Sequence, residues 1–378
     1  MRVLCTAVPG SGLFLPTVPL TWALLAAGHE VLLLNNGVGA RAAAGAGLPV
    51  VDPLPERDLW AEFMAAVAGM TQKDFTDGKR PDRGGFGWFG EQMIDGMLPV
   101  ARAFKPDLVI TTAEQGAGRL IAADLGVPLV EQGIRLGWAG LDEHVVSSRQ
   151  DIADYLEPTR GRLGLPAAPV NPVATVDVRP PSMGGVATDS QFLMRYVPYN
   201  ESRVVPGWVT LPPSRPRVCL TLGSVLPALG GIGVLRGILA DLSTMDVEVM
   251  LALGDIDLSE LGELPANVRP LGWMPLGALM PTCEAIVHHG GSATVMTPLV
   301  HGVPQVSLPK FADQPLNAKL MADRGVGLTV SEPEQVAEAL TEVLGQTKFR
   351  ETALEVRDEI AAQPSPADVV PRLAELLP

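Results

Sequence analysis

The sequence predicts an α/β protein with two doubly wound parallel sheets, because one pattern of elements occurs twice. An apolar run at residues 2–8, a glycine turn at 9–12 and a helical pattern at 15–27 begin a βαβ unit. The same order returns with an apolar run at 217–222 and a glycine-rich loop at 223–233. Right-handed crossovers of this kind build parallel sheets. A chain of 378 residues with 47% hydrophobic content is long enough to bury two cores.

The composition changes between the two repeats, which sets the expected domain boundaries. Residues 197–217 are rich in proline and read as an extended linker. We therefore expect a first domain at 1–205, a linker at 206–216 and a second domain at 217–360. A Pro-Ser-Pro break then precedes a short amphipathic helix within 361–378.

Charge and cysteine usage exclude several classes of partner. The net charge is −14 and the sequence pI is about 4.8, which argues against nucleic acid and anionic membranes as partners. Cys5, Cys219 and Cys283 read as buried thiols of a reducing compartment, and no His/Cys spacing suggests a metal site. Neither a leader peptide nor an apolar run of about 20 residues occurs, so we expect a cytoplasmic protein.

Residues 288–314 carry the strongest functional signal. A buried strand at 285–287 is followed by Gly290 and Gly291, and a helix begins near Ser292. The first N–H groups of such a helix have no internal partner, so this turn predicts an anion site. The side chains and turn expected to contact a diphosphate are Ser224, His289, Gly290, Gly291, Ser292 and Thr294. For Ser224 an ordinary turn serine is the alternative.

Two further positions extend the anion site to a sugar nucleotide. Asp313 and Gln314 offer a carboxylate and an amide, which suit neighbouring sugar hydroxyls. Trp273 follows a strand and is placed to stack on a nucleotide base, although a core tryptophan is the alternative reading. Diphosphate, sugar and base together indicate a sugar nucleotide.

These motifs together resemble a known enzyme family. Trp273-Met274-Pro275, the HHGG of 288–291, the GVP of 302–304 and the DQ of 313–314 are similar to the donor signature of family 1 nucleotide-sugar glycosyltransferases. Those enzymes have the GT-B fold of two facing Rossmann-like domains, and the likeness is to their antibiotic-tailoring branch. Further segments resemble calicheamicin rhamnosyltransferases (180–182, 197–199, 221–224) and aromatic-polyketide C-glycosyltransferases (131–132, 134–136, 194–196).

The resemblance implies a donor, an acceptor side and a packing arrangement. Thr297 stands where relatives that use ribonucleotides often carry glutamate, so it favours a dTDP-sugar as co-substrate. The reaction would need neither a metal nor a cofactor, and the partners would be small molecules, with a homodimer left open. The C-terminal helix would pack back on the first domain. The acceptor would contact Ser11, Leu13, Phe86, Trp88 and Trp138 in the first half. For Phe86 and Trp88 the alternative is a loop with one anchored aromatic cluster and no role in acceptor binding.

One departure from the family pattern concerns the catalytic base. Many relatives have a histidine in a Gly-His-x-x-Pro loop, whereas Leu13 holds that position here. The acceptor could be an acidic phenol that needs little help. A substitute base is the second reading: Glu131 is preferred, with Asp142, Glu143 and His144 nearby in sequence. The third reading is that the chain is not a catalyst.

The sequence-based hypothesis is an inverting hexosyltransferase that moves a sugar from dTDP to an aromatic natural product. Carbon–carbon bond formation is favoured over transfer to a phenolic oxygen, because Leu13 removes the usual base. The alternatives are a non-catalytic partner that binds a sugar nucleotide or aglycone, and a sugar-nucleotide epimerase with the same architecture.

Overall fold

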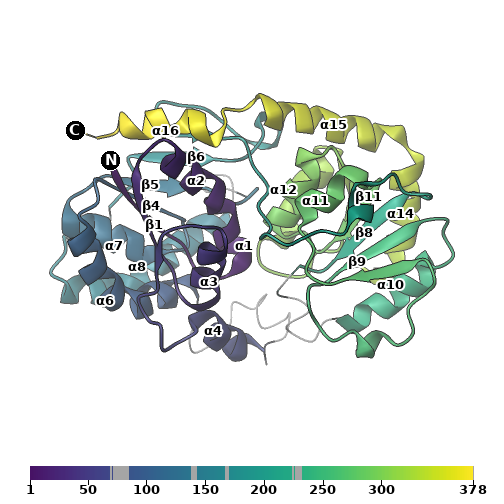
Figure 1. Ribbon diagram of the computed structural model, residues 1–378, viewed down its shortest axis with the longest axis horizontal. Coiled ribbons are helices and arrows are strands. Elements are labelled where there is room, and N and C mark those ends of the chain that lie inside the picture. The colour runs from purple at the N-terminus through teal and green to yellow at the C-terminus, as the bar shows by residue number, and fades with distance from the viewer. Residues whose placement is uncertain are drawn as a thin grey trace. The chain divides into compact units, whose positions relative to one another are not determined.

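The computed structural model describes residues 1–68, 70, 85–137, 143–166, 170–223, 225 and 232–377, with only the backbone described at 143–148. The chain forms two compact units, each with its own parallel sheet (Figure 1). Unit 1 comprises Met1–Arg179, Gly184–Arg195 and the chain from Gln363 onward. Unit 2 comprises Pro180–Met183 and Tyr196–Ala362. The predicted class, α/β with two doubly wound sheets, is confirmed.

Unit 1 contains a seven-stranded sheet in the order β3-β2-β1-β4-β5-β6-β7, with every described pair parallel. Its strands are β1 (Arg2–Thr6), β2 (Glu30–Leu34), β3 (Val50–Val51), β4 (Leu108–Thr111), β5 (Leu129–Gln132), β6 (Ala174–Asp177) and β7 (Gln191–Leu193). Its α-helices are α1 (Ser11–Phe14), α2 (Val18–Ala26), α3 (Gly37–Gly45), α4 (Leu59–Val67), α6 (Phe86–Phe104), α7 (Gly116–Leu125), α8 (Glu143–Arg162) and α16 (Pro366–Ala374).

Unit 2 contains a six-stranded parallel sheet in the order β10-β9-β8-β11-β12-β13. Its strands are β8 (Arg217–Thr221), β9 (Glu248–Ala252), β10 (Val268–Leu271), β11 (Ala285–His288), β12 (Gln305–Ser307) and β13 (Gly327–Thr329). Its α-helices are α10 (Leu235–Leu242), α11 (Leu276–Leu279), α12 (Ser292–Val300), α13 (Gln314–Asp323), α14 (Val336–Gly345) and α15 (Thr347–Ala362).

The central strands are buried along their whole length and apolar in their middle, because helices cover both faces of a doubly wound sheet. All residues of β4, β8 and β11 are buried, which explains why these segments read as continuous apolar runs rather than as alternating patterns. The core of unit 2 joins β8, β9 and β11 to α10 and α14. In unit 1 the core joins β1 and β4 to α6 and α7.

The proline-rich stretch between the repeats is more ordered than the predicted extended linker. It contains a 3-10 helix, Gly207–Thr210, whose Val209 is fully buried in a second cluster of unit 2. The guanidinium groups of Arg217 and Arg269 lie 5.1 and 4.6 Å from the ring centre of Trp208. These cation–π contacts and the burial of Val209 hold the stretch on unit 2.

The C-terminal helix α16 packs against α2 within unit 1 (Figure 1). It begins with a capping box, in which the Ser365 side chain accepts from the Asp368 backbone and the Asp368 side chain accepts from the Ser365 N–H. Val369, Val370 and Leu373 form its buried face. The amphipathic pattern of the tail therefore serves packing on the first unit.

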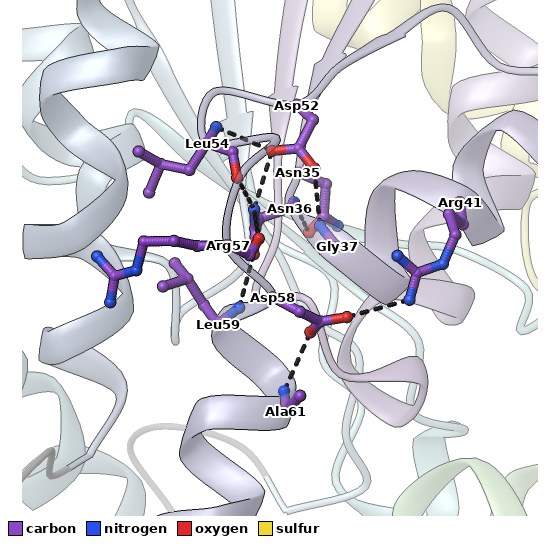
Figure 2. A network of polar contacts seen from close by, with 10 residues as sticks. All are labelled: Asn35, Asn36, Gly37, Arg41, Asp52, Leu54, Arg57, Asp58, Leu59 and Ala61. Atoms are coloured by element: carbon purple, nitrogen blue, oxygen red, sulfur yellow. Dashed lines mark hydrogen bonds and ion pairs between the residues drawn. The ribbon is translucent and has the colours of Figure 1, made fainter.

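A buried asparagine organises the loops at the carboxyl ends of β2 and β3 (Figure 2). The Asn36 side-chain amide donates to Asp52 Oδ1, to the carbonyl of Leu54 and to the carbonyl of Arg57, at 2.9, 3.0 and 2.9 Å. Its Oδ1 accepts from the N–H of Leu59 at 2.9 Å. One side chain thus bonds to the backbone of Leu54, Arg57 and Leu59 in the β3–α4 connection.

Replacing Asn36 with alanine should lower the free energy of unfolding by about 2–4 kcal/mol, because buried backbone groups then lose their partner. Urea unfolding followed by circular dichroism measures this change. Arg41→Ala is the matched control, since Arg41 makes a single exposed contact to Asp58 in the same network and should cost less than about 0.5 kcal/mol. Equal losses in the two variants would contradict this account.

Candidate functional site

Unit 2 has a topological switch point at the carboxyl ends of β8 and β11, and the ligand position expected there is called the crevice below. β8 lies between β9 and β11, so the chain leaves these neighbouring strands toward opposite sides of the sheet. Ligands of open α/β sheets bind at such a switch point. The two loops touch there: a Cβ at Gly223 would lie 2.4 Å from the His289 ring, so only glycine fits. Gly223 also has a φ of +69°.

Helix α12 opens directly into this crevice. Its N-cap is Gly291, which has no side chain to cap the helix. The first N–H groups of an α-helix have no partner inside the helix, and the helix dipole adds positive potential at this end. Ser292 is partly exposed at the start of the helix, and Thr294, two residues further on, is buried.

The glycine turn is held in place by His288, which is itself buried. His288 Nδ1 accepts from the Gly290 N–H at 2.9 Å, so its proton is on Nε2, which donates to Gln305 Oε1 at 2.8 Å. The Gln305 amide donates in turn to the Val295 carbonyl at 3.0 Å. This relay links strand, turn and helix and supports the φ of +86° at Gly290. Burial lowers the pKa of His288 to about 3.

His289 is the polar side chain at the centre of the crevice. Its ring lies between Gly223 and Gly291, where added Cβ atoms would come within 2.4 Å of it. Its Nδ1 is buried and has no hydrogen-bond partner among the described residues. Burial lowers the pKa of His289 to about 4, although the charge of Asp313 acts in the opposite direction. His289 is therefore neutral near pH 7 and has one N–H to donate.

The loop that carries Asp313 and Gln314 lies against the same turn. Asp313 is partly exposed and accepts from Asn317 Nδ2 at 3.1 Å, while the same amide donates to the Gly290 carbonyl at 3.0 Å. Gln314 is buried, and its Oε1 accepts from the N–H groups of Lys310 and Phe311 at 2.9 and 3.3 Å. Asp313 is thus presented to a ligand, whereas the Gln314 carbonyl is used by the loop itself.

Asn317 is a residue of this site that the sequence reasoning missed. It is fully buried and connects the glycine turn to Asp313. Its spacing of four residues from Asp313 places the two on one face of α13, which is the signal that could have identified it. Ala312, directly before Asp313, has a φ of +57°, which is a strained backbone conformation for alanine.

Trp273 is anchored at its edge while its ring stays partly exposed. Its Nε1 donates to the Asn200 carbonyl at 3.0 Å, and its backbone N–H donates to Asp255 Oδ1 at 3.0 Å. The residue lines a cavity of about 350 Å³ together with Trp208 and Arg269. A fixed, partly exposed indole is compatible with the predicted stacking on a base.

The structure does not bring every predicted donor residue to the crevice. Thr297 is 0% exposed, and its hydroxyl donates to the Ala293 carbonyl at 2.8 Å, so a direct contact with a ribose is not supported. It contacts Tyr196 instead, and burial raises the pKa of that phenol to about 12. Ser224 and Trp138 lie outside the described residues.

Unit 1 has its own switch point, between β1 and β4. Ser11 and Leu13 lie there in α1, and both are partly exposed. Phe86 begins α6, partly exposed, with the Arg135 guanidinium 5.6 Å from its ring centre. Trp88 is 5% exposed and packs edge-on against Phe89 at 5.1 Å. The acceptor role predicted for Trp88 is therefore replaced by a core role.

The base predicted at Glu131 also needs correction. Glu131 is 0% exposed, and its two carboxylate oxygens are held by Arg119 and Arg149. Burial is the strongest influence on its pKa and raises it, while the two guanidinium groups act against that shift. A carboxylate with both oxygens occupied by arginines is a structural element rather than a general base.

Two negative findings apply to the described part of the chain. No cluster of three or more His, Cys, Asp or Glu side chains within it is arranged to hold a metal ion. None of its helices combines the length and the apolar character that crossing a membrane requires.

Comparison with known proteins agrees with this geometry. Family models described as "Erythromycin biosynthesis protein CIII-like" match residues 22–223 with their N-terminal domain and residues 236–376 with their C-terminal domain. The chain belongs to this family. Elloramycin glycosyltransferase ElmGT of Streptomyces olivaceus is 37% identical to this CIII-like chain over 99% of it and 97% of the relative.

Solved structures extend the comparison to the fold. The glycosyltransferase SnogD from Streptomyces nogalater superposes with a TM-score of 0.83 at 36% identity, covering 100% of this chain and 99% of that one. SsfS6 from Streptomyces sp. SF2575, solved with thymidine diphosphate, gives a TM-score of 0.82 at 34% identity and 99% coverage of both chains. The CIII-like chain is thus a GT-B glycosyltransferase of the natural-product type, as the motifs predicted.

The depressed pKa of His288 makes stability dependent on pH. In the unfolded chain His288 takes up a proton near pH 6.5, whereas in the fold it resists protonation down to about pH 3. Stability therefore falls as pH drops, by about 1.4 kcal/mol per unit between pH 6 and 4.5 for this group. The free energy of unfolding, measured with urea at several pH values, should therefore fall more steeply with decreasing pH in wild type than in His288→Gln. Parallel slopes would rule out a neutral, buried His288.

Proposed function

We propose that this protein is an inverting glycosyltransferase that moves a hexose from a dTDP-sugar to an aromatic natural product. The observation that carries the donor half is the glycine turn at the start of α12, together with the buried Nδ1 of His289, which has no hydrogen-bond partner among the described residues. A diphosphate supplies the acceptor oxygens that both features need. The partly exposed Asp313 beside them suits the hydroxyls of the attached sugar.

Departure of the diphosphate is assisted by charge stabilisation. When the bond between the anomeric carbon and the phosphate oxygen breaks, negative charge grows on the leaving phosphate. The α12 N–H groups and the neutral His289 N–H are fixed before the reaction, so they stabilise that charge without reorganising. The sugar is then attacked from the face opposite the leaving group, which inverts the anomeric centre. We propose that this arrangement serves in place of a metal ion.

Thymidine as the nucleoside is supported by two observations. The helical position where ribonucleotide-using relatives often carry glutamate is Thr297, buried and without charge. SsfS6, similar to this chain over nearly its whole length, was solved with thymidine diphosphate. A glutamate at this position would lose its 2′-hydroxyl partner when a deoxyribose is bound. Threonine carries no carboxylate, so a deoxyribose leaves no charged group without a partner.

An aromatic acceptor is supported by the residues of unit 1. Leu13 occupies the place of the usual histidine and is partly exposed beside Ser11, with Phe86 partly exposed on α6. An alcohol would need the missing base, whereas a phenol with a pKa near 10 needs much less help. Its phenolate is nucleophilic at oxygen and at the ortho carbon, and we favour the carbon product.

The proposal is tested by incubating the protein with a panel of dTDP-sugars and aromatic aglycones and reading products by mass. A product heavier by one sugar, formed with dTDP but not UDP donors, is the expected result. Hot acid then separates the linkages, because a carbon-linked sugar survives and a phenolic glycoside is cleaved. Absence of transfer from every dTDP-sugar would overturn the assignment.

Replacing His289 with alanine should weaken thymidine diphosphate binding about 10–100-fold, because a hydrogen bond to a charged group is lost. Isothermal titration of thymidine diphosphate measures the effect, and an unchanged thermal melt shows that the fold is kept. His301→Ala is the control, since His301 lies at the opposite end of α12 and should keep wild-type affinity. Unchanged affinity in the His289 variant would place the diphosphate elsewhere.

Introducing the family histidine tests the acceptor chemistry. Leu13→His should change kcat for a phenolic acceptor less than about threefold, because a readily ionised hydroxyl gains little from an added histidine. The same variant should raise transfer to an aliphatic alcohol by a larger factor. Steady-state rates on matched phenol and alcohol acceptors measure the difference, and a large gain on phenols would show that a base limits the wild type.

A further inference from the structure

The loop after β4 in unit 1 contains buried polar atoms that nothing described satisfies. Glu114 Oε2 and Thr112 Oγ1 are both buried without a hydrogen-bond partner. Both follow β4, which ends at Thr111 and borders the switch point with β1. Buried polar atoms are nearly always paired in folded proteins, so two in one loop call for an explanation.

The loop is tied to the start of the chain. The Thr112 N–H donates to the Thr6 carbonyl at 3.3 Å, and the Gln115 side chain donates to the Ala7 carbonyl at 3.3 Å. Glu114 stands between these two anchored residues. It therefore lies beside the loop after β1 that leads to Ser11 and Leu13 in α1.

Among the described residues, only one oxygen of the Glu114 carboxylate has a partner. Glu114 Oε1 forms an ion pair with Arg135 Nη2 at 2.7 Å. The Glu114 side chain is 6% exposed and the Arg135 side chain 16%. The guanidinium also lies over the Phe86 ring, 5.6 Å from its centre, which fixes the direction of the pair. Glu131 has arginines on both oxygens and Thr297 has its hydroxyl bonded, so neither offers a comparable unused atom.

We propose that Glu114 is the catalytic carboxylate of the acceptor side, and that its Oε2 binds the phenolic hydroxyl of the acceptor and takes its proton. Arg135 is a positioning residue that holds the carboxylate through Oε1, and the Thr112 hydroxyl is a second polar contact for the same ligand. This inference rests on the proposed function for the identity of the acceptor. It assigns the proton acceptor that Leu13 does not provide.

The proposed step balances as follows. The phenol proton passes to Glu114 Oε2, and the electron pair released forms a bond from oxygen or the ortho carbon to the anomeric carbon of the sugar. The anomeric carbon–oxygen bond breaks, and its electrons leave with thymidine diphosphate. In the carbon case the ring then loses its ortho proton to solvent, which restores the aromatic ring as a phenolate. A carboxylate is a weak base, which suits a phenol better than an alcohol.

The test uses binding first, so that it does not depend on turnover. The full-length protein, saturated with thymidine diphosphate, is titrated with 2-naphthol and with 2-methoxynaphthalene, which lacks the donating hydrogen. Wild type should bind the naphthol at least about tenfold more tightly, and Glu114→Gln should reduce this preference to less than about threefold. A preference that is absent in wild type, or that survives in the variant, would overturn the proposal.

Two further variants separate a local role from a structural one. Glu157→Gln removes an exposed carboxylate paired with Arg160 in the same unit and should leave the naphthol preference unchanged. If circular dichroism shows that Glu114→Gln does not fold, Glu114→Asp replaces it, because aspartate keeps the charge but places its carboxylate one methylene further back. This variant should still lose most of the preference for 2-naphthol. A wild-type preference retained by Glu114→Asp would count against direct contact.

Turnover distinguishes this proposal from the proposed function. On a phenol that wild type glycosylates, Glu114→Gln should lower kcat about tenfold while the KM for the dTDP-sugar stays within twofold, a smaller loss than a base gives with an alcohol. The loss should shrink as acceptors with more acidic hydroxyls are used, and an equal loss on all of them would overturn proton transfer to Glu114. If the naphthol preference depends on Glu114 but no dTDP-sugar is used, the contact stands and the proposed function fails.

Discussion

The donor half of this molecule depends on one hydrogen-bonded relay behind a glycine turn. His288 holds the Gly290 N–H, Gln305 holds His288, and the Val295 carbonyl holds Gln305. Each bond is buried, so breaking any of them leaves polar groups unpaired in the core. Because the relay consumes the polar atoms of His288, it leaves the next residue, His289, to face the crevice. Two adjacent histidines with the same chemistry thus have opposite roles, because His288 is the last residue of β11 and His289 already belongs to the turn that follows it.

The sequence predicted the parts of the fold that follow from local pattern. Apolar runs and glycine turns located the strands and the mouth of α12, because backbone geometry there admits few residue types. It did not predict which polar side chains are used internally. Gln314 and Thr297 carry suitable groups at suitable spacings, yet Gln314 holds its own loop and Thr297 faces the core. Their orientation depends on neighbours far away in the chain, which no local pattern encodes.

The same limit explains the acceptor side. Phe86 and Trp88 are close in sequence, yet Trp88 is buried within the core of unit 1, whereas Phe86, the first residue of α6, is only partly buried against it. Glu131 was a reasonable candidate because it ends a strand. Its partners Arg119 and Arg149 come from α7 and α8, elements whose packing on β5 only the fold defines. Glu114 lay in a segment with no recognisable motif, and only its unsatisfied oxygen distinguishes it.

The charges of the two units serve different chemical needs, although the chain as a whole is acidic. In unit 2 the start of α12 supplies partial positive charge, and His289 is kept neutral by burial, so this position favours an anion without a buried full cation. In unit 1 the buried carboxylates of Glu131 and Glu114 both form ion pairs with arginine, but they differ in how many of their oxygens are paired. Two arginines make Glu131 inert, whereas one arginine orients Glu114 and leaves an oxygen for a proton. A fully paired carboxylate serves the fold, and a half-paired one is available to a substrate.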